Sequence, residues 1–432
     1  MSRTYAIRGG AGSGVKVGKR DPVSKSHRRV IARKGRALAL VVSLVTVAFV
    51  TMAGASVMRN RDASSSTTLH QHSSAQSGGW IVPADEVSAP AVPTPGGAQL
   101  GEGAFNAVTC SSSTDCVAVG GDVNLNGIAA TSSDGGTSWS AASVETGQPE
   151  FDAVSCSGTS HCVAVGVGNA ATSSDGGATW TSVSIPTPAT TLLGVSCPTS
   201  TFCVSVGVTP VAAGPYGGDL LVSSDGGSDW STPQLPAHVS ALGSVDCPGA
   251  NFCIAAGAEI LKSDDGGQSW TPEFVNGGTG VLRNVSCTSA TQCVAIGPNG
   301  QGAGDPSAAA FAVSTTDGGS TWDSVAMPSK SYTLNAIDCS GDGSCVASGP
   351  GPNATAPDVV STDGGSTWSN GTSLPSSVSA VASIACSSPI HCALVGLEGS
   401  TPVTGATNDG LTWNVQPVAA TATTTTMTGV SQ

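Results

Sequence analysis

The sequence has little charge, few aromatic residues and, beyond residue 61, almost no basic side chains. Charged residues make up 10% of the chain and aromatic residues 4%. From Asp62 onward there are 28 acidic residues but only three basic ones, Lys262, Arg283 and Lys330. A surface this acidic repels phosphate backbones, so we expect no nucleic-acid partner. Hydrophobic residues still reach 39%, which is enough to form a sizeable core.

Long hydrophobic runs are also scarce, and the one that stands out is Ala37–Met58, 22 residues without a charge. Residues 1–36 before it hold 11 Lys and Arg residues, which predicts a basic cytoplasmic N-terminus and a transmembrane signal-anchor at 37–58. The alternative is a signal peptide cleaved near Ala53-Gly54-Ala55, which would release a secreted protein. Both interpretations place the rest of the chain outside the cytoplasm, either on the cell membrane or free of it.

Several functional motifs are missing. No Walker loop, dinucleotide fingerprint or Ser-His-Asp signature occurs, and we expect no cofactor. A weak calcium candidate begins with Asp122, Asn124 and Asn126, but the twelfth position of that loop is Ser133 where a calcium loop has Glu. We expect a hairpin turn there instead.

What the sequence does contain is a sevenfold cysteine pattern, C-x5-C. The spacing differs from the C-x2-4-C of zinc sites, and no further ligands lie nearby. Facing residues on two antiparallel strands lie about 4.5–5.5 Å apart, within disulfide range, and an extracytoplasmic location is oxidising. We therefore predict seven disulfides and no free thiol: Cys110–Cys116, Cys156–Cys162, Cys197–Cys203, Cys247–Cys253, Cys287–Cys293, Cys339–Cys345 and Cys386–Cys392.

A second element follows each cysteine pair, with the pattern Ser-x-Asp-Gly-Gly-x-x-Trp. The Asp can accept hydrogen bonds from the backbone of a tight turn, the glycines permit positive φ, and the Trp can fill the gap between two sheets. We interpret these residues as structural: Asp134 and Trp139, Asp175 and Trp180, Asp225 and Trp230, Asp265 and Trp270, Asp317 and Trp322, Asp363 and Trp368, and, with one residue lost, Asp409 and Trp413.

The spacing of the repeats and the short apolar runs within them predict an all-β fold. Repeat two reads as strands at 151–156, 162–167, 169–174 and 179–185, and successive repeats are 40–52 residues apart, as in propeller blades. We predict a seven-bladed β-propeller of four-stranded blades at 103–416, between a Ser/Pro-rich linker at 59–102 and a Thr-rich tail at 417–432. The expected blades span about 103–150, 151–190, 191–241, 242–279, 280–332, 333–379 and 380–416.

The Ser-x-Asp-Gly-Gly-x-x-Trp element resembles the Asp-box, or BNR repeat, of bacterial sialidases, sortilin-type receptors, some glycoside hydrolases and photosystem II assembly factor propellers. The resemblance covers about residues 103–416 and implies the propeller fold. A sialidase would need an arginine cluster and a Tyr nucleophile. The predicted propeller has one arginine, Arg283, and two tyrosines, Tyr216 and Tyr332, which disfavours that activity.

Two acidic residues are weak catalytic candidates. Asp246 and Asp338 stand immediately before the first cysteine of repeats four and six, where most other repeats have Ser or Thr. The first strand of a blade lines the central channel, so the two could meet near the axis and act as acid and base. The alternative is that they are solvated acids at strand ends.

Length variation points to a binding side. Insertions at 208–219, 298–310 and 350–358 all fall between the second and third strands of a blade, whereas the cysteine pairs and Asp-boxes lie at the opposite end. We expect a monomeric, non-enzymatic module that binds protein or glycan through these loops. Two alternatives stay open: an exported glycoside hydrolase that uses channel carboxylates, and an assembly factor for a membrane complex.

Overall fold

The computed structural model describes residues 103–187, 190–210, 217–273, 275–276, 281–299, 307–329, 331–351, 356–371, 374–410 and 412–418. The predicted anchor at 37–58, the linker and nearly all of the tail lie outside them. In the described part of the chain, no helix is long and apolar enough to cross a membrane.

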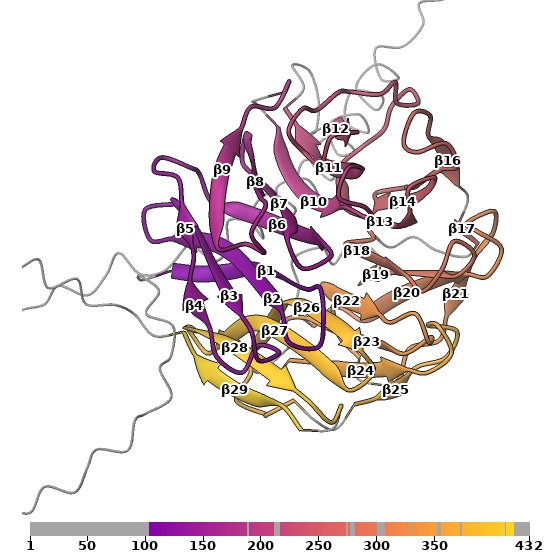
Figure 1. The fold of residues 1–432 in the computed structure, drawn as a ribbon. Coiled ribbons are helices and arrows are strands. Elements are labelled where there is room, and N and C mark those ends of the chain that lie inside the picture. The colour runs from indigo at the N-terminus through magenta and orange to yellow at the C-terminus, as the bar shows by residue number, and fades with distance from the viewer. Residues whose placement is uncertain are drawn as a thin grey trace, which may run out of the picture. The chain divides into compact units, whose positions relative to one another are not determined.

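Seven antiparallel sheets follow one another around a ring, as Figure 1 shows, and together they form a seven-bladed β-propeller. We number the blades along the chain and letter their strands A to D from the channel outward. The strands are β1 (Gly103–Cys110), β2 (Cys116–Asp122), β3 (Gly127–Ser132) and β4 (Ser140–Ala141) in blade 1; β6 (Phe151–Ser157), β7 (His161–Gly166), β8 (Asn169–Ser173) and β9 (Thr179–Val183) in blade 2; β10 (Thr191–Ser196), β11 (Cys203–Thr209) and β12 (Gly217–Ser223) in blade 3; β13 (Leu242–Gly249), β14 (Phe252–Gly257), β15 (Ile260–Ser263) and β16 (Thr271–Glu273) in blade 4; β18 (Asn284–Cys287), β19 (Cys293–Pro298), β20 (Ala310–Thr315) and β21 (Trp322–Val325) in blade 5; β22 (Ala336–Cys339), β23 (Cys345–Ser348), β24 (Asp358–Ser361) and β25 (Ser369–Asn370) in blade 6; and β26 (Ala380–Ser388), β27 (His391–Glu398), β28 (Thr401–Thr407) and β29 (Asn414–Pro417) in blade 7.

The outermost strands depart from a simple four-strand pattern in two ways. In blade 3 strand D is reduced to one bridge between Val222 and Ser231. After leaving blade 1, the chain forms β5 (Ser143–Val144), which pairs in parallel with β9 of blade 2, and β17 (Val275–Asn276) does the same with β21 of blade 5. These additions cover the outer edge of the next blade, which would otherwise present unpaired backbone groups.

In the described part of the chain, side-chain packing and hydrogen bonds close the ring, without a shared strand. Blade 1 and blade 7 are each built from consecutive strands, and within the described residues no strand from one end of the chain completes a blade at the other. At this junction the Val108 backbone N–H donates to Ser383 Oγ at 3.3 Å. Phe105 and Trp139 of blade 1 pack there on small side chains such as Ala393 of blade 7.

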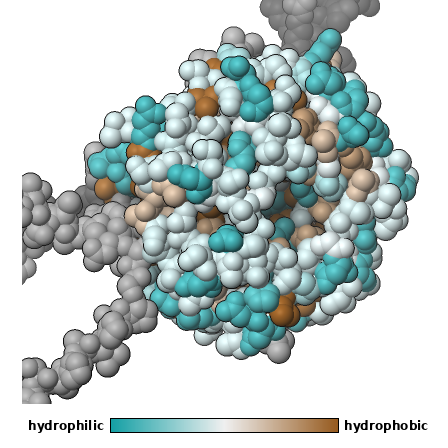
Figure 2. Space-filling view, in the orientation of Figure 1, coloured by the Kyte–Doolittle hydropathy of each residue, from teal (hydrophilic) through white to brown (hydrophobic). Residues whose placement is uncertain are grey.

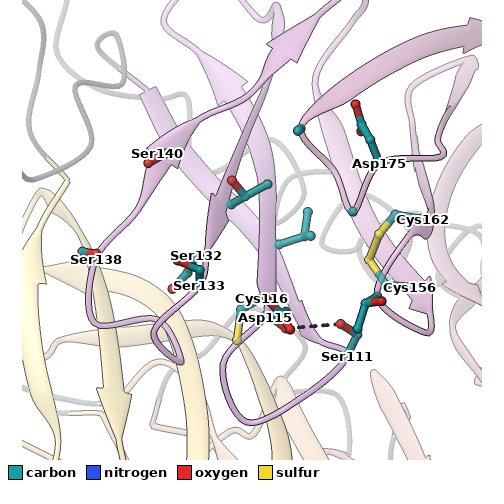
Figure 3. Close-up of a pocket in the computed structure, with 15 residues that line it drawn as sticks. Ser111, Asp115, Cys116, Ser132, Ser133, Ser138, Ser140, Cys156, Cys162 and Asp175 are labelled. Atoms are coloured by element: carbon teal, nitrogen blue, oxygen red, sulfur yellow. Dashed lines mark hydrogen bonds between the residues drawn. A yellow bond between two sulfur atoms is a disulfide. The ribbon is translucent and has the colours of Figure 1, made fainter.

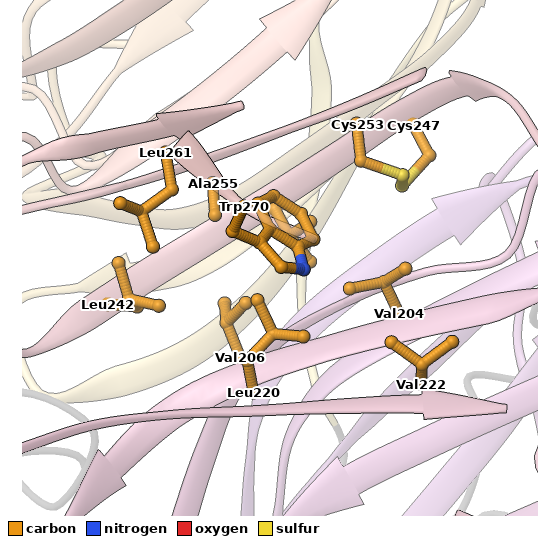
Figure 4. Close-up of a cluster of buried hydrophobic side chains, with 11 residues drawn as sticks. Val204, Val206, Leu220, Val222, Leu242, Cys247, Cys253, Ala255, Leu261 and Trp270 are labelled. Atoms are coloured by element: carbon orange, nitrogen blue, oxygen red, sulfur yellow. A yellow bond between two sulfur atoms is a disulfide. The ribbon is translucent and has the colours of Figure 1, made fainter. Parts of the chain in front are cut away.

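The core consists of seven clusters, and each lies between two neighbouring blades. Figure 4 shows the cluster around Trp270, in which Val204, Val206, Leu220 and Val222 of blade 3 meet Leu242, Ala255 and Leu261 of blade 4. In every blade, the Trp that ends the Ser-x-Asp-Gly-Gly-x-x-Trp element packs in this way against the preceding blade. Burial of these side chains therefore stabilises the junctions as well as the individual sheets.

All seven predicted disulfides are present, and the described residues contain no free cysteine. Each joins the end of strand A to the start of strand B, with Cα atoms 3.9–4.2 Å apart. This is closer than the separation expected from the sequence. The reason is local: Ser111 N–H bonds to the Asp115 carbonyl, which makes the next pair, Cys110 and Cys116, a non-hydrogen-bonded pair, the closer of the two kinds.

Candidate functional site

The Ser-x-Asp-Gly-Gly-x-x-Trp elements form the turns between strands C and D. In blade 2, Asp175 Oδ1 accepts hydrogen bonds from the Ser173 hydroxyl at 2.8 Å and the Thr179 backbone N–H at 2.9 Å, and its Oδ2 accepts one from the Thr179 hydroxyl. The hydrogen bonds from Thr179 are the main reason that the pKa of Asp175 is lowered. This carboxylate thus holds its own turn together, the arrangement that a structural role requires.

The second glycine of the turn brings two blades close together. Gly177 has a φ of +87°, and a Cβ placed on it would lie 2.8 Å from Val117 Cγ2 of blade 1. The Trp180 indole N–H donates to the carbonyl of this same glycine. The turn therefore needs glycine both for its conformation and for the close approach of the blades.

The two weak catalytic candidates lie on strand A, and both are engaged in bonds between blades. Asp246 Oδ2 accepts the backbone N–H of Cys287 in blade 5 at 2.7 Å, and Asp338 Oδ2 accepts that of Cys386 in blade 7 at 2.5 Å. At three other junctions a serine Oγ in the equivalent position accepts the cysteine N–H of the next blade: Ser155 from Cys197, Ser196 from Cys247 and Ser286 from Cys339. These five side chains form a belt of hydrogen bonds around the channel.

The belt carboxyl groups are half-buried and surrounded by protein. Burial raises the pKa of both Asp246 and Asp338 to about 6, and the charge of Asp246 contributes to the shift of Asp338. A raised pKa suits an acid catalyst, but one oxygen of each group is already held by a backbone N–H. The geometry favours a role in joining the blades.

The weak calcium candidate is a hairpin turn. Asp122 Oδ1 accepts the backbone N–H groups of Asn124 and Asn126 at 2.7 and 2.8 Å, and its Oδ2 accepts the Asn126 side-chain amide. The residues act as donors to Asp122, which is the arrangement of an Asx-turn. No group of three or more His, Cys, Asp or Glu residues that could hold a metal occurs among the described residues.

A pair of buried acids escaped the sequence analysis. Glu150 Oε2 and both carboxyl oxygens of Asp152 are buried without a hydrogen-bond partner in the described part of the chain. Burial raises the pKa of Glu150, and burial together with the neighbouring Glu150 raises that of Asp152 well above its usual value. Asp152 occupies a β-bulge at the start of blade 2. In the sequence, this pair was marked only by two acids close together at the start of an inner strand.

The lone arginine of the propeller immediately precedes the inner strand β18 of blade 5. Arg283 Nη1 donates to Asn335 Oδ1 of blade 6 at 2.5 Å, and burial lowers the pKa of the guanidinium to about 10. One arginine provides no cluster of the kind that a sialidase needs.

The side of the ring that carries the turns between strands B and C, which we call the B–C side, has exposed apolar residues. Val123, Leu125 and Val167 lie in the B–C turns of blades 1 and 2 and are 61%, 46% and 46% exposed. Leu125 also has a φ of +66°, a strained value for a side chain of this kind. Half of the residues in the three insertions expected to form the binding side, 17 of 34, lie outside the described residues.

The opposite side, with the A–B and C–D turns, we call the A–B side. It contains a pocket of about 230 Å³ between blades 1 and 2, shown in Figure 3. Figure 2 shows one side of the ring, hollowed near its middle, with a surface of mostly intermediate hydropathy, scattered hydrophilic residues and hydrophobic residues in small separate groups.

Comparison with known proteins identifies the fold. No family model and no curated protein matches the chain. Among solved structures, an ancestral GH74 enzyme aligns with a TM-score of 0.55 and 13% identity over 75% of this chain and 47% of its own, and GH74 from Niastella koreensis with 0.51 and 16% over 74% and 55%. YCF48 from Cyanidioschyzon merolae aligns with 0.50 and 18% over 69% and 94%. The chain thus spans about half the length of the GH74 enzymes, and these likenesses concern the propeller alone.

Proposed function

We propose that this chain is a membrane-tethered, non-enzymatic propeller that binds a protein partner outside the cytoplasm through its B–C side. The observation that carries the proposal is the exposure of Val123, Leu125 and Val167 in neighbouring blades. Single exposed apolar residues are ordinary, whereas several gathered at one end of adjacent sheets favour a contact surface. These side chains are aliphatic, which favours a protein partner over a glycan stacked on aromatic rings.

The strained turn supports the same conclusion. Leu125 keeps a positive φ while its side chain points into solvent, and strain of this kind tends to occur where a function requires it. A non-enzymatic role is supported by the hydrogen-bond belt, because Asp246 and Asp338 each hold the backbone of the next blade. The tether is proposed from the charge-free run at 37–58 and its basic flank.

The test compares full-length protein with a Val123→Ser, Leu125→Ser, Val167→Ser variant. Proteins that co-purify from cross-linked native cells are quantified by mass spectrometry. The matched control is Ile390→Ser, which removes an equally exposed apolar side chain (47%) from the A–B hairpin of blade 7. We expect a specific partner to fall at least tenfold with the triple variant and to stay unchanged with the control.

Equal co-purification with both variants would refute a B–C binding surface. Alkaline extraction of membranes, followed by N-terminal sequencing of the protein, tests the tether. Recovery in the soluble fraction with a new N-terminus near residue 55 would replace the anchor with a cleaved signal peptide.

A further inference from the structure

The pocket on the A–B side lies between the cysteine hairpin of blade 1 and the cysteine hairpin and C–D turn of blade 2. In Figure 3, Ser132, Ser133, Ser138 and Ser140 lie along one side, and Asp175 and the Cys156–Cys162 disulfide lie along the other. Asp115 stands near Ser111 in the hairpin of blade 1. The walls of the pocket thus come from two successive repeats, blades 1 and 2.

In blades 2 to 5, the residue just before the second cysteine of the disulfide covers the C–D turn of the following blade. Its side chain thus fills the space that corresponds to the pocket. Phe202 and Phe252 each bring a ring carbon within 3.9 Å of the position that a Cβ would take on Gly266 and Gly318, the first glycine of the next C–D turn. The His161 ring lies within 2.9 Å of the same position on Gly226. Gln292 covers Gly364 and donates to the Asp363 carbonyl at 2.9 Å.

Blade 1 has Asp115 in that place, and its side chain turns back on its own hairpin. Asp115 Oδ2 accepts hydrogen bonds from the hydroxyls of Ser112 at 2.8 Å and Thr114 at 3.3 Å. As a result, within the described residues a Cβ placed on Gly176 would have only the carbonyl group of Thr159 within 4 Å, and no side chain. The space that this side chain occupies at the next four junctions is therefore left open here.

The open pocket is lined with hydrogen-bond acceptors and negative charge. Thr131, Ser133, Ser140 and Thr159 line it, and within the described residues their hydroxyls make no hydrogen bond to protein. Asp115 Oδ1 likewise accepts none there, and the hydrogen bonds that lower the pKa of Asp175 keep this second carboxylate ionised at neutral pH. No basic or aromatic residue is among the lining residues.

Size and charge together select the ligand. At about 230 Å³ the pocket is smaller than the ~300–1,000 Å³ typical of sites for drug-sized molecules, so it suits a single side chain. Two carboxylates without a neighbouring cation attract positive charge, and an ammonium group has three donors for the free acceptors. The lack of an aromatic platform disfavours a sugar ring.

We propose that this pocket binds the lysine side chain of a protein partner, with Asp115 and the free hydroxyls as acceptors and Asp175 as the second negative charge. The site goes beyond the function proposed above, because it lies on the opposite side of the ring and does not depend on the B–C surface. The open groove between blades 1 and 2 is what distinguishes it from the four filled ones.

The probe is the peptide acetyl-Gly-Gly-Lys-Gly-Gly-amide, titrated into full-length protein and followed by ligand-observed NMR. The same peptide with norleucine in place of lysine keeps the aliphatic stem but lacks the ammonium group, with its charge and its three donors, and glucose serves as a polyol probe. Asp115→Asn keeps the shape of the pocket without its charge. Asp115→Phe introduces the side chain that fills the equivalent grooves of blades 3 and 4.

We expect the lysine peptide alone to bind wild-type protein. Asp115→Asn should weaken it at least fivefold, and Asp115→Phe should abolish it. Raising NaCl from 50 to 500 mM should weaken it further, because the pocket is open to solvent. Unchanged binding to Asp115→Phe, or equal binding of the norleucine peptide, would overturn the proposal, and binding of glucose in place of lysine would identify a polyol site.

The Val123→Ser, Leu125→Ser, Val167→Ser variant should bind the lysine peptide normally. This result separates a failure of the pocket from a failure of the B–C surface, since the two sets of substitutions lie on opposite sides of the ring.

Discussion

The Asp338 carboxylate accepts the backbone N–H of Cys386 across the junction between blades 6 and 7. Asp246 makes the equivalent bond to Cys287, and serines provide it at three other junctions. An acid in this position can hold the next blade only by remaining half-buried in the channel, where its charge is costly. The belt therefore ties the stability of the ring to pH.

Replacing both acids with Asn should change how stability depends on pH. The folded pKa of each group, about 6, lies above its ordinary value of 3.8, so the stabilisation from proton binding is complete below about pH 3.8 and is lost as pH rises through 6. Asp246→Asn with Asp338→Asn should remove this loss, which amounts to up to about 3 kcal/mol for each carboxyl. Urea unfolding of both proteins at pH 3.5 and pH 7.5, on either side of the two pKa values, measures this loss. Parallel pH profiles would contradict the assignment.

Asp152→Asn should stabilise the protein at pH 8. Asn106 occupies the equivalent bulge in blade 1, and its amide donates to the Phe151 carbonyl at 2.9 Å. An amide at position 152 would also avoid the repulsion from Glu150 that helps raise the pKa of Asp152. We expect a gain of about 1–2 kcal/mol at pH 8 that shrinks as pH falls, by chemical denaturation. A loss of stability at pH 8 would show that the charged carboxylate is needed.

Trp230→Ala should cost about 3–5 kcal/mol, because the side chain is 8% exposed and packs between blades 2 and 3. Trp368 has the same place in blade 6 but is only partly buried. Trp368→Ala is therefore the matched control, with a smaller expected loss of free energy of unfolding. If Trp230→Ala cost less than about 1 kcal/mol, the ring would be available for ligand stacking.

Gly177→Ala should destabilise the protein more than Gly147→Ala. Both glycines have a φ near +87°, so both substitutions carry the conformational cost of about 1–2 kcal/mol. A Cβ on Gly147 would meet nothing within 4 Å, whereas one on Gly177 would lie 2.8 Å from Val117 Cγ2. We expect an extra cost of about 1–3 kcal/mol for Gly177→Ala in thermal unfolding. Equal losses would mean that blades 1 and 2 can move apart freely.

Much of the fold was predictable because each repeat carries its own markers. The cysteine pair marks the end of strand A and the start of strand B, and the predicted strands of repeat two agree with β6, β7, β8 and β9 within two residues. The reduced strand D of blade 3 and the parallel additions β5 and β17 were not foreseen, since they depend on how the chain crosses between blades.

The candidate site was less accessible from sequence. The bonds of Asp246 and Asp338 reach strand A of the next blade, about one repeat further along the chain, and no local pattern specifies such a partner. The pocket depends on which way one side chain turns: Asp115 bonds to its own hairpin, whereas Phe202 covers the next blade. The repeat pattern marks the position of both residues but not the direction of their side chains.

Within the described residues no strand is shared across the junction of blades 1 and 7, so one repeat of the sequence corresponds to one blade, apart from the short strands β5 and β17. Each repeat contains strands A to C of its own blade, a disulfide, a turn-forming Asp and the Trp that packs on its predecessor, while repeats 1 and 4 also contribute a short outer strand, β5 or β17, to the following blade. Duplication or loss of one repeat in the gene would therefore insert or remove one blade. The junction that closes the ring would again form from the Trp of one blade and the small apolar side chains of its neighbour. The number of blades in such a ring can therefore change by one blade for each repeat gained or lost.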